Sequence, residues 1–143
     1  MLHCKMKHRN PIDDTICAIL SGYTRIAIVG LSSKPTRDSN RVGSYLLEQG
    51  YDIVPVNPEI DSALGLKAYP DLFSVPPPVE VVDIFRRVQY IPEIVDRAIQ
   101  TGARAIWMQN GLVQEASAEL ARQAGLLVVM NRCMMFEHTM HFA

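Results

Sequence analysis

Five short and almost continuously apolar runs recur along the 143 residues, separated by stretches with helical periodicity. Val and Ile dominate the runs without polar alternation, which is typical of strands buried on both faces of a parallel sheet. The runs are Ile26–Leu31, Asp52–Val56, Val79–Phe85, Arg104–Gln109 and Leu126–Met130. Such strands need helices on both faces, so the pattern predicts a three-layer α/β fold.

Helices are predicted between the strands and before the first one. They are Asn40–Gln49, Ile91–Thr101, Val113–Gln123 and Asp13–Leu20, the last with Asp13 or Asp14 as its N-cap. Gly50, Gly102 and Gly125 follow the first three and suit the left-handed end of a helix. Residues 57–78 contain five prolines and predict a loop with one brief helix at Asp71–Ser74. Right-handed crossovers then favour a Rossmann-like doubly wound parallel sheet of about five strands.

Length and composition indicate one domain and exclude several classes of protein. A chain of 143 residues, 48% of them hydrophobic, can bury a core without a metal or disulfide. We expect one domain over residues 1–143, with a flexible N-terminal segment at 1–12 and a C-terminal tail at 134–143. The net charge of −1 argues against nucleic-acid binding. No apolar stretch predicts a membrane span or a secretory signal, so a cytoplasmic protein is expected.

The turn after the first strand has the composition of an anion site. Gly30, Ser32, Ser33 and Lys34 lie between this strand and the following helix, and Arg41 lies within that helix. A strand-to-helix turn presents backbone N–H groups and the positive end of the helix dipole to a phosphate. A solvated surface turn is the alternative interpretation.

The dinucleotide fingerprint is absent in its strict form. Ser32 stands where the second glycine is expected and Pro35 where the third is expected. The second strand is followed by Asn57 rather than by the carboxylate that holds the ribose of NAD. The sequence therefore favours phosphate binding over nicotinamide dinucleotide binding.

Four collinear segments form a specific combination: IAIVGLSSKPTRDSNRVGSYLLEQGYDIVPVNP, VEVVDIFRR, GARAIWMQNG and VVMNRC. Together they resemble the small CoA-binding proteins, which are single Rossmann-like domains similar to the CoA-binding domain of succinyl-CoA synthetase α subunits. The resemblance covers residues 13–133 and implies coenzyme A, or an acyl-CoA, as the ligand. The synthetase has its phosphohistidine and nucleotide-grasp machinery in other domains, and this chain contains neither.

The resemblance also implies which residues contact the ligand. The phosphates lie over the turn after the first strand, the adenosine beside the second strand end, and the pantetheine arm across the third and fourth. The implied residues are Gly30, Ser32, Ser33, Lys34, Arg41, Val56, Asn57, Pro58, Phe85, Arg86, Gln109, Asn131 and Cys133. Asp83 is expected to be a structural, hydrogen-bonded carboxylate rather than a ligand contact.

The cysteines and histidines invite further interpretations. An odd, scattered set of three cysteines, Cys4, Cys17 and Cys133, predicts free thiols in a reducing compartment. Cys133 follows the last strand, where it is either a reactive thiolate near a cation or a packed small hydrophobe. Zinc-ligand types cluster near both termini, but their spacing matches no zinc motif, so no metal site is predicted. They are His3, Cys4, His8, His138 and His141.

The function expected from the sequence is CoA binding without catalytic machinery, as a carrier, a sensor or an accessory subunit. No acid–base pair is predicted at the strand ends, and no second domain is predicted that would exclude water from a reaction. The partner is a small-molecule CoA ligand, and a protein partner remains open. The alternatives are a small NAD(P)-binding oxidoreductase, a partner subunit of an acyl-CoA synthetase, and a structural domain with an empty site.

Overall fold

Five parallel strands form the central sheet, in the order β2-β1-β5-β6-β7. Each overlaps one of the predicted apolar runs. The strands are β1 (Arg25–Val29), β2 (Asp52–Val56), β5 (Val81–Ile84), β6 (Ala105–Met108) and β7 (Leu127–Val129). The computed structural model describes residues 4–5 and 10–142.

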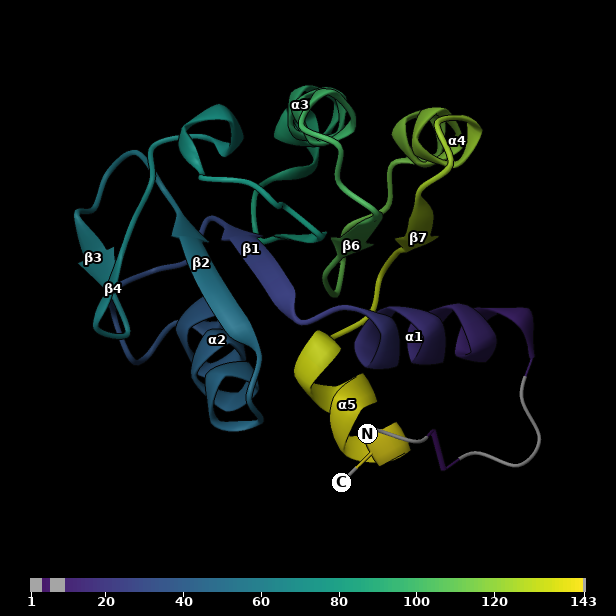
Figure 1. Cartoon of the computed structure of the whole chain (residues 1–143), viewed down its shortest axis with the longest axis horizontal. Helices are drawn as coiled ribbons and strands as arrows, with labels where there is room; N and C mark the ends of the chain where they lie inside the picture. Colours follow the sequence, from purple (N-terminus) through teal and green to yellow (C-terminus); the bar gives the residue numbers. More distant parts are fainter. Residues whose placement is uncertain (1–3, 6–9, 143) are drawn as a thin grey trace.

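Helices cover both faces of this sheet (Figure 1). On one face lie α3 (Ile91–Gln100) and α4 (Glu115–Gln123). On the other face lie α1 (Pro11–Gly22), α2 (Asp38–Glu48) and α5 (Met134–Phe142). The arrangement confirms the predicted three-layer α/β fold with a Rossmann-like doubly wound sheet.

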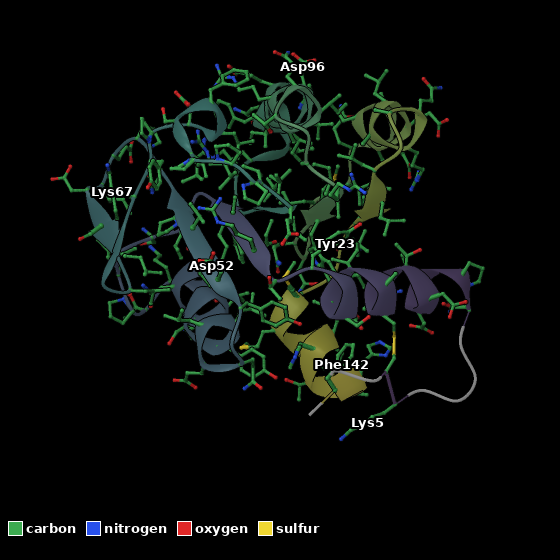
Figure 2. All side chains as sticks on the ribbon, in the orientation of Figure 1. Lys5, Tyr23, Asp52, Lys67, Asp96 and Phe142 are labelled. Carbon is green, nitrogen blue, oxygen red and sulfur yellow. A yellow bond between two sulfur atoms is a disulfide. The ribbon has the colours of Figure 1, made fainter. Side chains whose placement is uncertain are left out.

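Both faces of the strands are buried, as the almost continuously apolar runs predict. Ile26 and Ile28 of β1 belong to the core beneath α1, α2 and α5, whereas Ala27 and Val29 belong to the core beneath α3 and α4. Figure 2 shows side chains filling the space on each side of the sheet, while Lys67 and Asp96 lie at the periphery. The single tryptophan, Trp107 of β6, is fully buried, as expected for a core residue.

The strand order places a topological switch point between β1 and β5. From β1 the chain crosses to β2 on one side, and it later returns to β5 on the other side. The connections at the carboxyl ends of β1 and β5 therefore diverge to opposite faces of the sheet. A doubly wound sheet binds its ligands in the crevice that this divergence opens.

Two local expectations were incomplete. The loop between β2 and β5 contains a two-stranded antiparallel sheet, β3 (Ser62–Ala63) with β4 (Leu66–Lys67), which the sequence pattern did not predict. These strands are too short to carry a visible alternation of apolar and polar residues. The brief predicted helix is present as a 3₁₀ turn, η1 (Leu72–Ser74), capped by Asp71, and a second, η2 (Val88–Tyr90), precedes α3.

The N-terminal helix begins earlier than expected and uses a different cap. Asn10 is the N-cap, because its side chain accepts the Asp13 N–H at 2.9 Å while the Asp13 carboxylate accepts the Asn10 N–H. This reciprocal pair is a capping box. Asp13 therefore occupies the third helical position rather than the cap, and Pro11 and Ile12 belong to the helix. Of the expected flexible segment, residues 1–3 and 6–9, which include His3 and His8, lie outside the described residues.

The C-terminal residues form helix α5 instead of the expected tail. Polar residues of this helix are buried, including Glu137, His138 and His141, so its sequence lacks a plain apolar stripe. His138 shares a 2.8 Å hydrogen bond with the Tyr45 hydroxyl, and its ring stacks on Phe142. Burial lowers the pKa of His138. Such polar contacts across helices cannot be inferred from hydrophobic periodicity.

The expectation of three free cysteines is also wrong. Cys4 and Cys17 are joined by a disulfide, and Cys133 is free. The pairing arises because residue 4 lies beside α1, the helix that contains Cys17. Among the described residues, none of the helices is long and apolar enough to cross a membrane.

Candidate functional site

The turn that follows β1 is held against the end of β5. Gly30 has φ of +92°, and a Cβ built there would lie 2.5 Å from the carbonyl oxygen of Phe85. Its N–H donates to the carbonyl of Val56 at 2.8 Å, so this glycine joins three strand ends. The lack of a side chain at Gly30 is thus required by chain packing, whether or not a ligand approaches.

Side chains of α2 and of Asn57, which follows β2, fix the next residues of the turn. The Ser32 N–H donates to Ser39 Oγ at 2.9 Å, and Asn40 Nδ2 donates to the Ser32 carbonyl at 2.8 Å. Asn57 Nδ2 donates to the carbonyl of Leu31 at 3.1 Å. The turn is therefore preorganised, and Asn57 has a structural role in it.

The first turn of α2 is open toward this loop. Arg37 occupies the N-cap position, but no side chain caps the helix. The first N–H groups of a helix have no partner within the helix, so an uncapped end presents them to an anion together with the positive end of the dipole. Asp38 is the acidic residue in this turn, and it is paired with Arg41.

A cavity of about 580 Å³ lies over the turn and the α2 end. Its volume is in the usual range for small-molecule sites. Positive charge comes from Lys34 and Arg37, and negative charge from Asp38 and Glu59. The lining residues are Gly30, Ser32, Ser33, Lys34, Thr36, Arg37, Asp38, Ser39, Asn57, Glu59, Ile60 and Phe85.

A second cavity, of about 510 Å³, continues from the first across the ends of β5 and β6. The two cavities share Asp38 and Phe85. The second is richer in cations and apolar groups. It is lined by Asp38, Arg41, Val42, Phe85, Arg86, Arg87, Gln109, Asn110, Leu112, Cys133 and Met135. Together the cavities form one crevice at the predicted switch point.

A third, smaller cavity of about 140 Å³ lies on the α3 side of the edge. Arg86 lines both this cavity and the second, and its guanidinium carbon lies 4.4 Å from the centre of the Tyr90 ring. Val56 and Pro58 face this third cavity, whereas Asn57 faces the first. The turn predicted to hold adenosine is therefore divided between two cavities.

The structure brings twelve of the thirteen predicted residues to these cavities. Asn131 is the exception, because it is not among their lining residues. Its backbone has φ of +58°, and its side chain accepts the Gly111 N–H at 2.7 Å. Asn131 therefore stabilises the loop after β6 rather than lining the crevice.

Gln109 and Asp83 form a buried pair at the base of the second cavity. Gln109 Nε2 donates to Asp83 Oδ1 at 2.6 Å, while Gln109 Oε1 accepts the Met134 N–H at 3.4 Å. Burial raises the pKa of Asp83 to about 7, against the opposing effect of this hydrogen bond from Gln109. Asp83 is fully buried, which agrees with the structural role expected for it.

Cys133 lines the second cavity and is partly buried. The neighbouring Arg132 is engaged elsewhere, because its guanidinium donates to Glu137 Oε1 at 3.1 Å. His138, five residues along, faces Tyr45 and Phe142. The described contacts thus assemble no nucleophile, base and orienting group around this thiol.

Several lining residues were missed by sequence reasoning. Asp38 and Ser39 line the crevice because α2 begins at Asp38, and Met135 does so because α5 exists. Arg87 follows the predicted Phe85-Arg86 pair, so its position after a strand was a usable signal. Glu59 and Ile60 come from the loop after β2, whose course no sequence pattern predicted.

Comparisons with known proteins agree with this fold and identify a family. A family model described as a CoA binding domain matches residues 24–139. An uncharacterized protein of Bacillus subtilis, YneT, is 38% identical over 130 residues, which are 91% of this chain and 96% of that protein. A solved structure of a hypothetical protein from Pyrococcus horikoshii OT3 has a TM-score of 0.86 and 44% identity, covering 94% of this chain and 97% of that one.

A larger enzyme contains a related segment. Acetate–CoA ligase (ADP-forming) II of Archaeoglobus fulgidus is 28% identical over 93 residues, which are 63% of this chain and 14% of the ligase. This chain therefore resembles a small part of the ligase and nearly the whole of the two shorter relatives.

Proposed function

This chain belongs to the family of CoA-binding domains, and we propose that it binds coenzyme A, or an acyl-CoA, in the crevice over β1, β5 and β6. The observation that carries the proposal is the continuity of two cavities. One lies over an uncapped helix end, and the other extends from it past Arg41 and Arg86 to Cys133. A ligand with phosphates at one end and a long flexible arm at the other matches this layout.

The phosphates of the ligand would occupy the first cavity. Backbone N–H groups of the first turn of α2, with the hydroxyls of Ser32 and Ser33, would donate to phosphate oxygens. Lys34 and Arg37 lie in the same cavity and supply positive charge. Asp38 opposes an anion, but its pairing with Arg41 offsets that charge.

The pantetheine arm would cross the second cavity. Leu112 and Met135 offer apolar contact there, and Cys133 lies at the same cavity. Gln109 already uses one donor and one acceptor within the protein, so we expect it to shape the base of the cavity more than to hold the arm.

We further propose that binding occurs without catalysis, so that the protein serves as a carrier, a sensor or an accessory subunit. What supports this proposal is the surroundings of the crevice. Among the described residues, no hydrogen bond joins the Cys133 thiol to a base, and Asp83 lies buried beneath Gln109. General acid–base chemistry requires such groups within hydrogen-bond reach of the reacting atoms.

A ligand series tests the proposal by thermal unfolding. A ligand at about 100 times its dissociation constant stabilises the native state by roughly 2.7 kcal/mol. At about 2–4 °C per kcal/mol for a domain of this size, saturating CoA should raise Tm by roughly 5–10 °C. Dephospho-CoA should raise it less, because it lacks the 3′-phosphate, and NAD or NADP should have almost no effect.

The order of these shifts decides between the alternatives. Equal stabilisation by NAD and CoA would favour a dinucleotide-binding protein, and no shift with either would favour a structural domain. Mass spectrometry of ligand released from freshly purified protein gives an independent answer. Recovery of CoA or an acyl-CoA is the expected result.

A further inference from the structure

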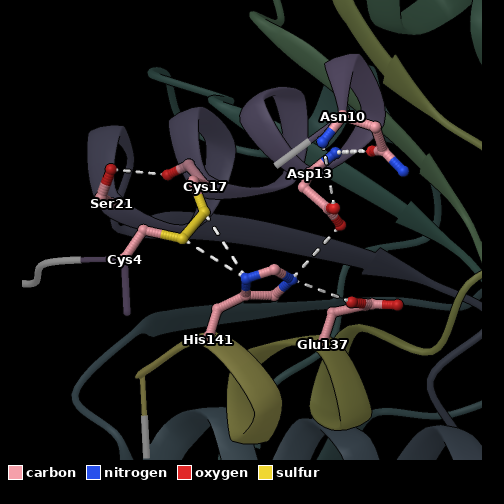
Figure 3. The surroundings of a disulfide bond; sticks show 7 residues. All are labelled: Cys4, Asn10, Asp13, Cys17, Ser21, Glu137 and His141. Atoms are coloured by element: carbon pink, nitrogen blue, oxygen red, sulfur yellow. Dashed lines mark hydrogen bonds and ion pairs between the residues drawn. A yellow bond between two sulfur atoms is a disulfide. The ribbon is translucent and has the colours of Figure 1, made fainter. Parts of the chain in front are cut away.

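Three potential metal-ligand atoms converge between the N-terminal segment, α1 and α5 (Figure 3). Cys4 Sγ, Cys17 Sγ and His141 Nδ1 all lie within 4.8 Å of one another. In the structure the two sulfur atoms form a disulfide. None of these residues lines the crevice over β1, β5 and β6, so the cluster is separate from the proposed CoA site.

The distances between the imidazole and the sulfur atoms suit a tetrahedral metal ion. His141 Nδ1 lies 3.4 Å from Cys4 Sγ and 3.7 Å from Cys17 Sγ. Around a tetrahedral zinc ion with Zn–S of about 2.3 Å and Zn–N of about 2.0–2.1 Å, a sulfur and a nitrogen ligand are about 3.5 Å apart. Only the two sulfur atoms must separate, and rotation of reduced cysteine side chains permits this.

The other nitrogen of His141 faces carboxylates. His141 Nε2 lies 3.3 Å from Glu137 Oε2 and 3.8 Å from Asp13 Oδ1. A histidine that ligates a metal commonly donates its second ring N–H to a carboxylate, which orients the ring and strengthens the ligand. A proton on Nε2 leaves Nδ1 with a free lone pair, and Figure 3 shows this nitrogen facing the two sulfur atoms.

The cluster is held in place by the surrounding structure. Cys17 and His141 are buried, with 6% and 2% of their surface exposed, while Cys4 is partly exposed. The Lys5 N–H donates to the carbonyl of His141 at 2.8 Å, which holds residues 4–5 against α5. Because Cys4 is partly exposed, an ion can reach the two buried ligands from the side of Cys4.

We propose that, once the disulfide is reduced, Cys4, Cys17 and His141 bind a thiophilic divalent cation such as Zn²⁺. Two thiolates and one imidazole are the ligand types that zinc prefers, and the fourth tetrahedral position is left for water. The disulfide and the metal are thus alternative states of one cluster. Glu137 and Asp13 are positioning residues, because they act on the ion through His141.

Conversion of the disulfide state to the metal-bound state requires a reductant, and a phosphine supplies the two electrons. The disulfide accepts two electrons and two protons and becomes two thiols, while a trialkylphosphine takes the oxygen of one water molecule and becomes a phosphine oxide. Binding of the cation then displaces the two thiol protons to solvent. In the final state the two negative charges of the thiolates balance the two positive charges of the cation.

Cobalt provides the spectroscopic test on the full chain. The protein is reduced with a phosphine under anaerobic conditions, freed of reductant, and titrated with Co²⁺. One cobalt ion per chain should bind, with thiolate-to-metal charge-transfer bands and the intense d–d bands of tetrahedral cobalt. Stoichiometric Zn²⁺ should abolish these bands, and the oxidised protein should show none.

Variants locate the site. Cys4→Ser and Cys17→Ser should lose the charge-transfer bands, and Glu137→Gln should bind zinc about 10–100-fold more weakly. Cys133→Ser is the matched control, since it removes a thiol from outside the cluster and should leave cobalt binding unchanged. Circular dichroism checks that each variant is folded. If Cys17→Ser does not fold, Cys4→Ser alone tests the site, because Cys4 is partly exposed and lies before α1.

Two results would overturn the proposal. One is a reduced wild-type protein whose cobalt spectrum lacks thiolate bands. The other is a folded Cys4→Ser variant that binds zinc as tightly as the wild type does, which would place any bound ion elsewhere in the chain.

Discussion

Replacing Asp83 by Asn should remove a pH-dependent loss of stability. Asp83 lies in β5 and is fully buried, and its Oδ2 has no hydrogen-bond partner among the described residues. Burial raises the pKa of its carboxyl group from 3.8 to about 7, although the hydrogen bond from Gln109 acts in the opposite direction. Asparagine has nearly the same shape and keeps an oxygen that accepts the Gln109 N–H.

The magnitude follows from proton linkage. Between pH 3.8 and about 7, the native state keeps the Asp83 proton while the unfolded state releases it. The native state therefore binds more protons in this window, and the free energy of unfolding falls as pH rises, by about 1.4 kcal/mol per pH unit. Between pH 5 and pH 8, ionisation of Asp83 lowers the free energy of unfolding of the wild type by about 2–3 kcal/mol, because this decrease ends near pH 7.

Urea unfolding at pH 5, 6, 7 and 8, followed by the fluorescence of the single Trp107, measures the effect. The free energy of unfolding of Asp83→Asn minus that of the wild type should rise by about 2–3 kcal/mol between pH 5 and pH 8. Taking this difference cancels groups common to both proteins, including His138, whose pKa burial lowers. Asp61→Asn, at an exposed position, controls for the loss of one negative charge.

A difference that stays constant across this pH range would refute the reasoning. It would mean that Asp83 is ionised in the native state over the whole range, so burial would not control its protonation. Gln109 would then donate to a buried carboxylate rather than to a protonated carboxyl group.

Three further predictions concern the crevice. The double substitution Ser32→Asp with Ser33→Asp should weaken CoA binding more than tenfold in calorimetric titration, because two carboxylates would face the phosphates. Wild-type affinity in a folded double variant would contradict the assignment of this turn as the phosphate site. Gly30→Ala should lower stability by at least about 2–3 kcal/mol, since a Cβ at φ of +92° meets a backbone oxygen at 2.5 Å. Gly50→Ala, at φ of +98° with open space around its Cβ, should cost only about 1–2 kcal/mol, and equal losses of Tm would contradict this contrast. Arg41→Ala should weaken CoA binding by about 1–3 kcal/mol and by less at high salt, whereas Arg122→Ala, on α4, should leave the affinity unchanged.

Much of the sheet could be predicted because the apolar composition of its strands indicates that both of their faces are buried. The apolar runs around Ile26, Val54 and Val82 contain few polar residues, and only strands covered on both faces tolerate such composition. The turn after β1 was also predictable, because ligand sites of doubly wound sheets follow strand ends. That rule places Ser32 and Ser33 in the candidate site, and the resemblance to CoA-binding proteins adds Phe85 and Arg86.

Residues whose role depends on distant neighbours could not be assigned in this way. Asn131 follows a strand as the others do, yet its side chain bonds the backbone of Gly111, twenty positions away. His138 and His141 have the composition of a polar tail, but Tyr45 and Cys17 supply the partners that allow their burial in α5. Local sequence patterns do not indicate which distant residues will supply such partners.

The sequence alone determined the class of fold and the edge of the sheet at which a ligand site belongs. These depend on local periodicity and on the chirality of strand crossovers, which every parallel α/β chain shares. Only the tertiary structure decided that Asn57 faces one cavity while Val56 and Pro58 face another, and that Cys4, Cys17 and His141 meet. Those arrangements arise from packing between segments up to 137 positions apart, and local periodicity does not specify which distant side chains come into contact.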